Sequence, residues 1–227
     1  MTVSRLRLPH IDGEIGFSII LAIQVVVIFV VAPLAAIGAV SAELVEGLRF
    51  GLAATTIVII ARRTIVRWIV ALTFAATLVA SLHWHLGHTA SAIGIFRALA
   101  TISFDLMVAG IVAVAAFRPG RVTVHRILGA VILYLYIALI FAGLYRFLSP
   151  LLMPGFAGIA PDPRAQYSGL LYFSIGALTT SSSGEIVAVH PVLRSMASLE
   201  SVMGQLFPAT LLARLVSLHA AHQMRED

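Results

Sequence analysis

The stretch that decides the fold reads YFSIGALTTSSSGEIVAVHPVLRSMASLESVMGQLFPATLLARLV and occupies residues 172–216. It opens inside an apolar run from Tyr167 to Leu178, about twelve residues long, and a polar run from Thr179 to Glu185 follows. Twelve helical residues rise roughly 18 Å, which reaches into a bilayer but does not cross its hydrocarbon core of roughly 30 Å. In a membrane protein, this segment must therefore enter the bilayer and turn back.

The composition of the whole chain is that of a membrane protein. Hydrophobic residues make up 60% of the 227 positions, charged residues make up 11%, and the mean hydropathy is +1.02. Water could not solvate the surface that such a chain would present as a soluble globule. We expect an all-α membrane protein with six transmembrane helices plus a re-entrant pore helix, and no soluble ligand domain.

Apolar windows place the six transmembrane helices at residues 15–40, 44–61, 67–84, 91–117, 127–148 and 191–220. Pro33 removes a backbone donor from the first of them, so we expect a kink or an end there. The expected regions are a cytoplasmic segment, a four-helix domain, a cytoplasmic linker, a pore domain and a cytoplasmic tail, at residues 1–14, 15–117, 118–126, 127–220 and 221–227.

Charge placement predicts the orientation. All fifteen basic residues are arginines, and most lie at the ends of apolar runs on one side of the expected bilayer, with Arg164 and Arg194 as exceptions. The positive-inside rule then places both termini in the cytoplasm and residues 149–190 outside, as in a multi-pass protein of the inner membrane. Arginines placed in this way signal topology, so we expect no nucleic-acid partner. The chain has no cysteine and therefore no thiolate metal site.

The loop after the short helix is the candidate functional site. Irregular backbone at membrane depth is tolerated only where protein buries it or where it lines a water-filled path. By elimination we expect a pore-lining loop with Glu185 at its outer mouth. The other residues of this loop are Thr179, Thr180, Ser181, Ser182, Ser183 and Gly184.

The quoted stretch resembles the pore module of tetrameric potassium channels, in which a pore helix ends in Thr-Thr-Val-Gly-Tyr-Gly-Asp and an inner helix follows. Thr179 and Thr180 match the paired threonines, Gly184 the last filter glycine, and Glu185 the acid after it. The likeness covers about fifty residues closely. The upstream helices agree with six-helix channels only in number. The resemblance implies a homotetramer in a lipid bilayer.

The filter departs from that pattern, because Ser181, Ser182 and Ser183 stand where the family has Val, Gly and Tyr. A serine at 182 makes the backbone geometry of the first filter glycine less accessible, and no aromatic ring braces the loop. We expect non-selective or weakly potassium-selective passage of the monovalent cations K⁺ and Na⁺, which Glu185 would concentrate. A non-conducting channel-like scaffold and a strictly potassium-selective channel are the alternatives.

Three residues of the last helix are further candidates. Glu200 is an acid inside an apolar helix, and it would either brace the filter from behind or line the cavity. Gly204 and Pro208 would supply a gating hinge and a kink, although close packing explains a helical glycine equally well.

The remaining polar residues indicate no second function. The fourth expected helix carries only Arg97 and Asp105, whereas a voltage sensor needs a basic residue at every third position. Among His83, His85 and His88 only the pair at 85 and 88 has the spacing of helical metal ligands. We interpret the three as polar residues at the membrane interface, with metal or proton sensing as the alternative. We find neither catalytic spacing nor an inverted repeat, and expect neither an enzyme nor a transporter, with no cofactor, no metal and no catalytic residue.

Overall fold

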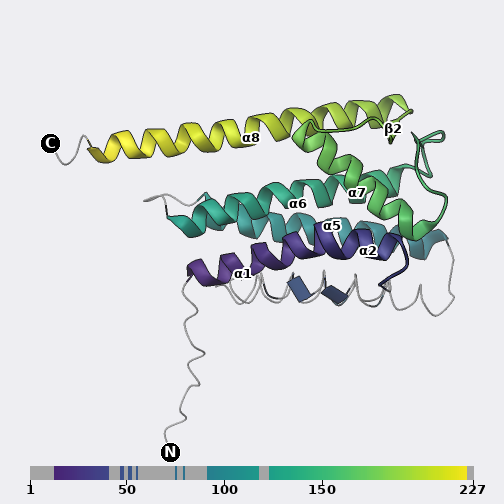
Figure 1. The fold of residues 1–227 in the computed structure, drawn as a ribbon, viewed down its shortest axis with the longest axis horizontal. Coiled ribbons are helices and arrows are strands. Elements are labelled where there is room, and N and C mark those ends of the chain that lie inside the picture. Colours follow the sequence, from purple (N-terminus) through teal and green to yellow (C-terminus); the bar gives the residue numbers. More distant parts are fainter. Residues whose placement is uncertain are drawn as a thin grey trace, which may run out of the picture.

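The computed structural model describes residues 13–40, 91–117 and 123–223, together with seven scattered positions between 47 and 79. The helices in these ranges are α1 Gly13–Val26, the π-helix η1 Val27–Val31, α2 Ala32–Ala36, α5 Ser91–Ala116, α6 Val124–Leu148, α7 Pro163–Thr179 and α8 Pro191–Gln223. Two short strands, β1 Phe156–Ala157 and β2 Val187–Ala188, flank α7 (Figure 1). The helices expected at 44–61 and 67–84 lie outside the described residues, as do His83, His85 and His88.

Three of the described helices are long and apolar enough to cross a membrane, namely Ile15–Ala36, Ala98–Ala116 and Arg126–Leu148. The expectation of a largely helical membrane protein is confirmed at this level. Six spans were expected, and α8 is not among these three although it has 33 residues. Its middle turns carry polar side chains such as Glu200 and Gln205, which make it less apolar than the other long helices.

Pro33 changes the first helix without ending it. The chain continues as α2 to Ala36, and the π-helical turn Val27–Val31 comes just before the proline. Proline has no N–H, so the carbonyl of Phe29, four residues earlier, loses its α-helical donor. A wider turn at this point is one of the known ways in which a helix accommodates that loss.

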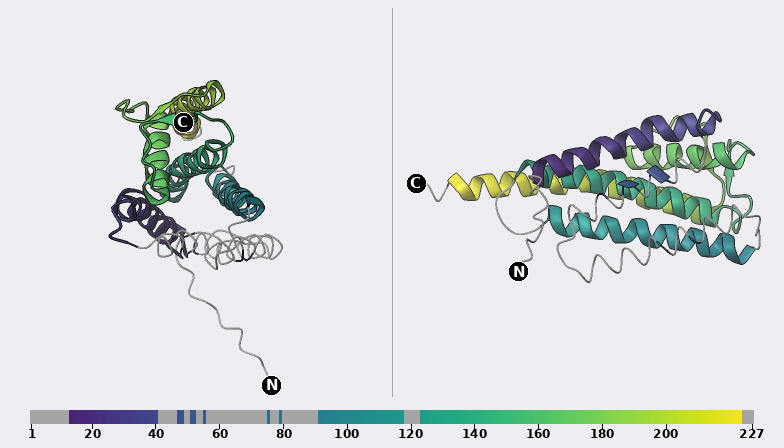
Figure 2. Two further views of the ribbon diagram at one scale, coloured as in Figure 1. Left: turned by 90° about the vertical axis from the view of Figure 1, so that its right-hand side faces the viewer. Right: turned by 90° about the horizontal axis from the view of Figure 1, so that it is seen from below.

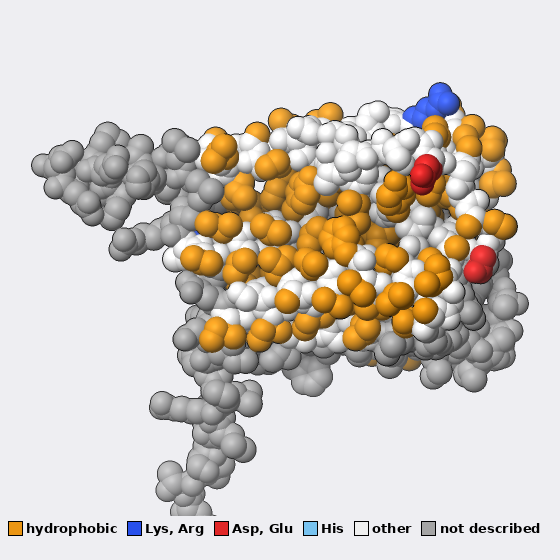
Figure 3. Space-filling model, in the orientation of Figure 1, with side chains coloured by type: hydrophobic (Ala, Val, Ile, Leu, Met, Phe, Trp, Pro, Cys, Tyr) orange, Lys and Arg blue, Asp and Glu red, His pale blue; other side chains and the backbone are white. Residues whose placement is uncertain are grey.

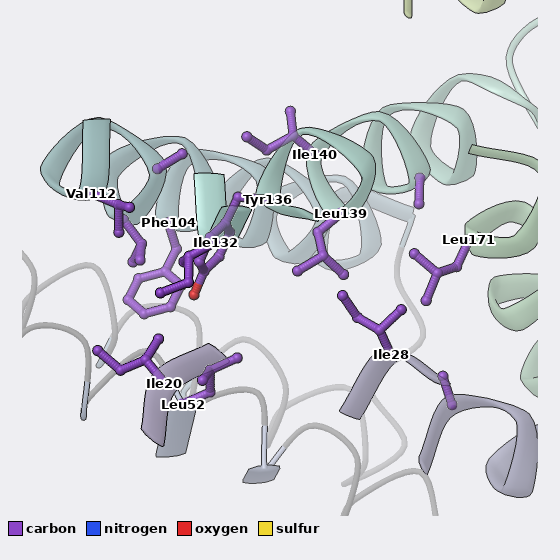
Figure 4. Packing of buried hydrophobic residues seen from close by; sticks show 14 of the residues in the cluster. Ile20, Ile28, Leu52, Phe104, Val112, Ile132, Tyr136, Leu139, Ile140 and Leu171 are labelled. Carbon is purple, nitrogen blue, oxygen red and sulfur yellow. The ribbon is translucent and has the colours of Figure 1, made fainter. Parts of the chain in front are cut away.

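The main hydrophobic core lies between α6 and the helices around it (Figure 4). Helix α6 contacts α1, α5, α7 and α8, and is the centre of the described bundle. Its side chains Ile132, Tyr136 and Leu139 are buried against residues of α1 and α5 such as Ile20 and Phe104. Burying these apolar side chains on several faces of α6 holds the neighbouring helices around it.

A smaller aromatic cluster attaches α7 to α6. Tyr145 of α6 meets Phe173 of α7 and Phe156 of β1 with ring centroids 5.4 and 5.5 Å apart. Phe156 and Phe173 also meet each other at 5.1 Å, and all three pairs are edge-on, the geometry that aromatic rings prefer. Leu170 and Leu193 complete the cluster, so it also includes the first turn of α8. The start of α8 is thereby fixed next to α7.

The chain enters and leaves the α7 region at the same end of the bundle. Strand β1 precedes α7, strand β2 follows the loop after it, and the two pair antiparallel with Phe156 opposite Ala188. In Figures 1 and 2, α7 starts at this end, stops part-way along α8, and the chain returns before α8 begins. Helix α1 begins and α8 ends at the opposite end of the bundle.

Gly158 allows this return. It has a φ of +81°, and a Cβ at this position would lie 1.9 Å from the carbonyl oxygen of Glu185. Only glycine combines that backbone conformation with so close an approach of the two segments. The turn after β1 therefore requires a glycine, which has no Cβ, at position 158.

Replacing Gly158 with alanine should lower the thermal unfolding midpoint of the detergent-solubilised protein. The left-handed backbone costs a non-glycine residue about 1–3 kcal/mol, and the clash with Glu185 adds to it. At about 2–4 °C per kcal/mol for a chain of this size, Tm should fall by at least several degrees. Gly110→Ala is the matched control, because a Cβ there meets nothing within 4 Å. Equal unfolding midpoints for the two variants would contradict the requirement for glycine at position 158.

Candidate functional site

The loop after α7 is exposed along its whole length. All seven residues from Thr179 to Glu185 are exposed, whereas the preceding residues Gly176, Ala177 and Leu178 are buried. In Figure 3 apolar side chains cover most of the visible described surface, and the few charged ones gather near the end where β2 lies. The loop thus joins a buried helix end to the end of this face where its visible described charges lie.

The end of α7 is a Schellman motif with threonine in the place usually taken by glycine. The N–H of Thr180 donates to the carbonyl of Ala177 at 3.2 Å, and that of Ser181 to the carbonyl of Gly176 at 2.9 Å. Thr180 has a φ of +57°, and no other described residue except glycine has a positive φ. For a β-branched residue this conformation is strained.

Side chains from two other helices complete this helix end. The Tyr134 hydroxyl of α6 donates to the carbonyl of Leu178 at 3.1 Å, and the Ser201 hydroxyl of α8 donates to that of Ala177 at 2.8 Å. Helices leave their last carbonyls without an internal donor, and burial of such a group without a partner is costly. The last turn of α7 is thus satisfied by the loop, by α6 and by α8.

Hydroxyl groups within and behind the loop hold its shape. The Thr179 and Ser181 hydroxyl oxygens lie 2.7 Å apart, and so do the oxygens of the Tyr172 and Ser183 hydroxyls. Position 183 has no aromatic residue, as the sequence indicated, but Tyr172 of α7 contacts its serine, and the sequence alone did not predict that contact. The sequence feature that could have indicated this contact is the position of Tyr172, two helical turns before Thr179 and Thr180.

Gln205 joins the loop to α8 from the exposed side of that helix. Its side-chain nitrogen donates to the Thr180 hydroxyl oxygen at 3.1 Å, and that hydroxyl in turn donates to the carbonyl of Thr179 at 2.7 Å. These bonds hold the side chain of the strained residue. The sequence pattern did not single out Gln205, because a glutamine on an exposed helix face has no distinctive spacing.

Gly204 lies where α8 is closest to α7. A Cβ at this position would be 1.8 Å from the carbonyl oxygen of Leu178, so close packing alone requires glycine here. Pro208, four residues later, lacks the N–H that would bond to the Gly204 carbonyl. Helix α8 nevertheless runs without a break from Pro191 to Gln223.

Glu200 is completely buried, with an exposed fraction of 0%. The Tyr145 hydroxyl of α6 donates to its Oε2 at 2.7 Å, and the Ser174 hydroxyl of α7 contacts its Oε1. Ser174 also donates to the carbonyl of Ala138 in α6 at 2.8 Å. The carboxyl group therefore connects α6, α7 and α8 behind the loop.

The other candidates are placed as follows. Gly184 has a φ of +80°, and Glu185 is exposed beside it at the end of the loop. Asp105 is buried in α5 with an exposed fraction of 6% and has an interaction partner, which suits polar packing between helices. In the ranges that the structure describes, no three His, Cys, Asp or Glu residues are grouped as a metal site would require.

The electrostatics of the loop favour cations. Helix α7 points its C-terminal end at the loop, and the helix dipole places partial negative charge there. The Glu185 carboxylate adds a negative group at the other end of the same loop. Between them lie hydroxyl and carbonyl oxygens, which are the ligands that alkali cations accept.

No family model, no curated protein and no solved structure matches this chain.

Replacing Thr180 with glycine should stabilise the protein while loosening the loop. Glycine adopts the left-handed conformation without the steric cost, roughly 1 kcal/mol or more, so Tm should rise by a few degrees. The variant also loses the hydroxyl that Gln205 holds, so amide hydrogen exchange in residues 180–184 should become faster. Thr210→Gly, in the helical part of α8, is the control and should lower Tm. A lower Tm for Thr180→Gly would contradict the strain at this residue.

Proposed function

We propose that this chain is one subunit of a homotetrameric channel that passes monovalent cations through the loop from Thr179 to Glu185. The observation that carries the proposal is the path of the chain, which enters the bundle as α7, forms an exposed loop, and returns to the same end. In a membrane protein, irregular backbone of this kind is tolerated where it lines a water-filled path.

A single chain leaves this path open on one side. Helix α8 packs on α7 and α6 and lies at one edge of the described bundle (Figure 2). Its outward face exposes the apolar side chains of Leu199, Val202, Leu206 and Leu212. In the proposed assembly four copies surround one axis, as in the family that the sequence resembles. The exposed faces of α8 and the loops then meet neighbouring subunits, the lipid or the ion path.

The same arrangement supports a membrane placement for α8. It begins at the end of the bundle that holds the loop and reaches the end where α1 begins. We propose that it spans the inner membrane as the last of six spans, with the loop outside and both termini cytoplasmic, as the arginines indicate. The region before the pore would support it without sensing voltage.

The proposed selectivity is weak. Ser181 and Ser183 are braced by the hydroxyls of Thr179 and Tyr172 and not by a packed aromatic ring. A filter that strips water from potassium needs its carbonyl rings held in place. Hydrogen bonds between hydroxyl groups orient individual side chains of the loop but do not pack it tightly. Partly hydrated K⁺ and Na⁺ should therefore both pass.

Purified protein in detergent should have the mass of four chains by native mass spectrometry. Reconstituted into planar bilayers, it should give single-channel currents that reverse close to 0 mV under opposed KCl and NaCl solutions. Glu185→Gln should reduce the current at low salt, because the ring of carboxylates that concentrates cations is lost. A tetramer without current over a range of voltages and cations would indicate the scaffold, and a reversal potential near the potassium equilibrium value would indicate strict selectivity.

Restoring the family filter tests whether ions pass through this loop. In the triple variant Ser181→Val, Ser182→Gly, Ser183→Tyr, the carbonyl cage becomes accessible again, and the reversal potential should shift toward the potassium equilibrium value. The matched control is Ser198→Ala, since Ser198 is exposed on α8 and its hydroxyl donates to the carbonyl of Arg194 in its own helix. An unchanged reversal potential in the triple variant would place the ion path elsewhere.

A further inference from the structure

A chain of three side chains lies behind the loop and contains one acid. Glu200, Ser174 and Tyr145 each have an exposed fraction of 0%. Their oxygens form an unbroken series, from the Tyr145 hydroxyl through both oxygens of the Glu200 carboxyl to the Ser174 hydroxyl and on to the carbonyl of Ala138. The series starts and ends on α6 and passes through α8 and α7.

The number of available protons determines which oxygen donates and which accepts in each hydrogen bond of this series. A serine hydroxyl has one proton to donate, and a backbone carbonyl can only accept. If Ser174 donates to the carbonyl of Ala138 at 2.8 Å, it has no proton left for the Glu200 Oε1 that it also contacts. The proton in that second contact must then come from the carboxyl group. Tyr145 supplies the proton of its own bond to Oε2.

The surroundings of Glu200 agree with a neutral group. Among the described residues its hydrogen bonds go to two hydroxyl groups, one from α6 and one from α7, and to no arginine. A charge taken out of water needs a partner of opposite charge, and an unpaired buried carboxylate is among the most costly groups in a protein.

We propose that Glu200 is a protonated carboxylic acid that donates to Ser174, accepts from Tyr145, and so positions α7 against α6 and α8. Every proton in the series then has one acceptor, from Glu200 Oε1 to Ser174 Oγ and from Ser174 Oγ to Ala138 O. Ser174 lies five residues before Thr179, so the series fixes the depth at which the loop begins. That consequence for the loop rests on the proposed function, whereas the protonation does not.

Infrared spectroscopy of the full-length protein in lipid vesicles at neutral pH tests the protonation directly. A protonated carboxyl group has a C=O stretching band well separated from those of carboxylates and amides. This band should be present in the wild-type protein and should lose intensity in Glu200→Gln. Glu185→Gln, which alters an exposed acid, should leave the band unchanged. A wild-type spectrum that Glu200→Gln does not change in this region would overturn the proposal.

Rescue by glutamine gives a second, independent readout. A glutamine side chain offers one acceptor and one donor group in nearly the same places as a carboxylic acid, so Glu200→Gln should keep the wild-type Tm and oligomeric state. Glu200→Ala leaves the Tyr145 hydroxyl without an acceptor and Ser174 Oγ without its donor, although Ser174 keeps its bond to the carbonyl of Ala138, and Tm should fall by roughly 5–10 °C. If glutamine destabilises the protein as much as alanine does, the carboxyl is not acting as a neutral donor. Neither readout requires a current, so a failure here is distinguishable from a failure of the proposed channel.

Discussion

The hydrogen bonds that satisfy the last carbonyls of α7 are the constraint on which the rest of the arrangement depends. A helix that stops inside a membrane protein leaves its final carbonyls where water does not reach them. Here the donors come from the loop itself, from Tyr134 on α6 and from Ser201 on α8. The helix end is therefore stable only when α6 and α8 are both in place, so the loop takes its position from three helices at once.

The approach of α8 follows from the same requirement. For Ser201 to reach the carbonyl of Ala177, α8 must come close enough that residue 204 has no room for a side chain. A hinge role for Gly204 therefore has to coexist with this contact, and any splaying of α8 would separate it from the carbonyl of Leu178. Pro208 leaves the Gly204 carbonyl without its usual helical donor, so bending at this turn would break no backbone bond there.

Much of this arrangement was predictable from the length and polarity of single segments. The run from Tyr167 to Leu178 is too short to cross a bilayer, and after α7 the chain returns to the end of the bundle where α7 begins. The helix begins earlier, at Pro163, because proline suits a first helical turn and the polar residues that follow it can be helical too. Hydropathy marks only the part of a helix that lies in lipid.

The partners in the site were beyond such reasoning. Tyr134 and Leu178 are 44 residues apart, and Tyr145 and Glu200 are 55 apart. Helical periodicity shows which face a side chain is on, but not which residue of another helix is opposite. A buried glutamate was recognisable as functional or bracing from its place in an apolar helix. The Tyr145 and Ser174 hydroxyls that bond to its carboxyl group can be identified only from the packing of α6, α7 and α8.

In the proposed channel, the serine run at residues 181–183 would allow ion chemistry to change while the architecture is kept. The return of the chain depends on Gly158, the β1–β2 pair and the aromatic cluster, none of which includes residues 181–183. Substitutions at those three positions can therefore alter the proposed filter while the surrounding framework is kept. A packed aromatic ring at position 183 would fill the space behind the loop. The hydrogen bond between Tyr172 and Ser183 orients the serine side chain but fills little space. Such a loop resists rotation of its side chains more than it resists widening. If it lines an ion path, as proposed, that path could widen and would distinguish potassium poorly from sodium.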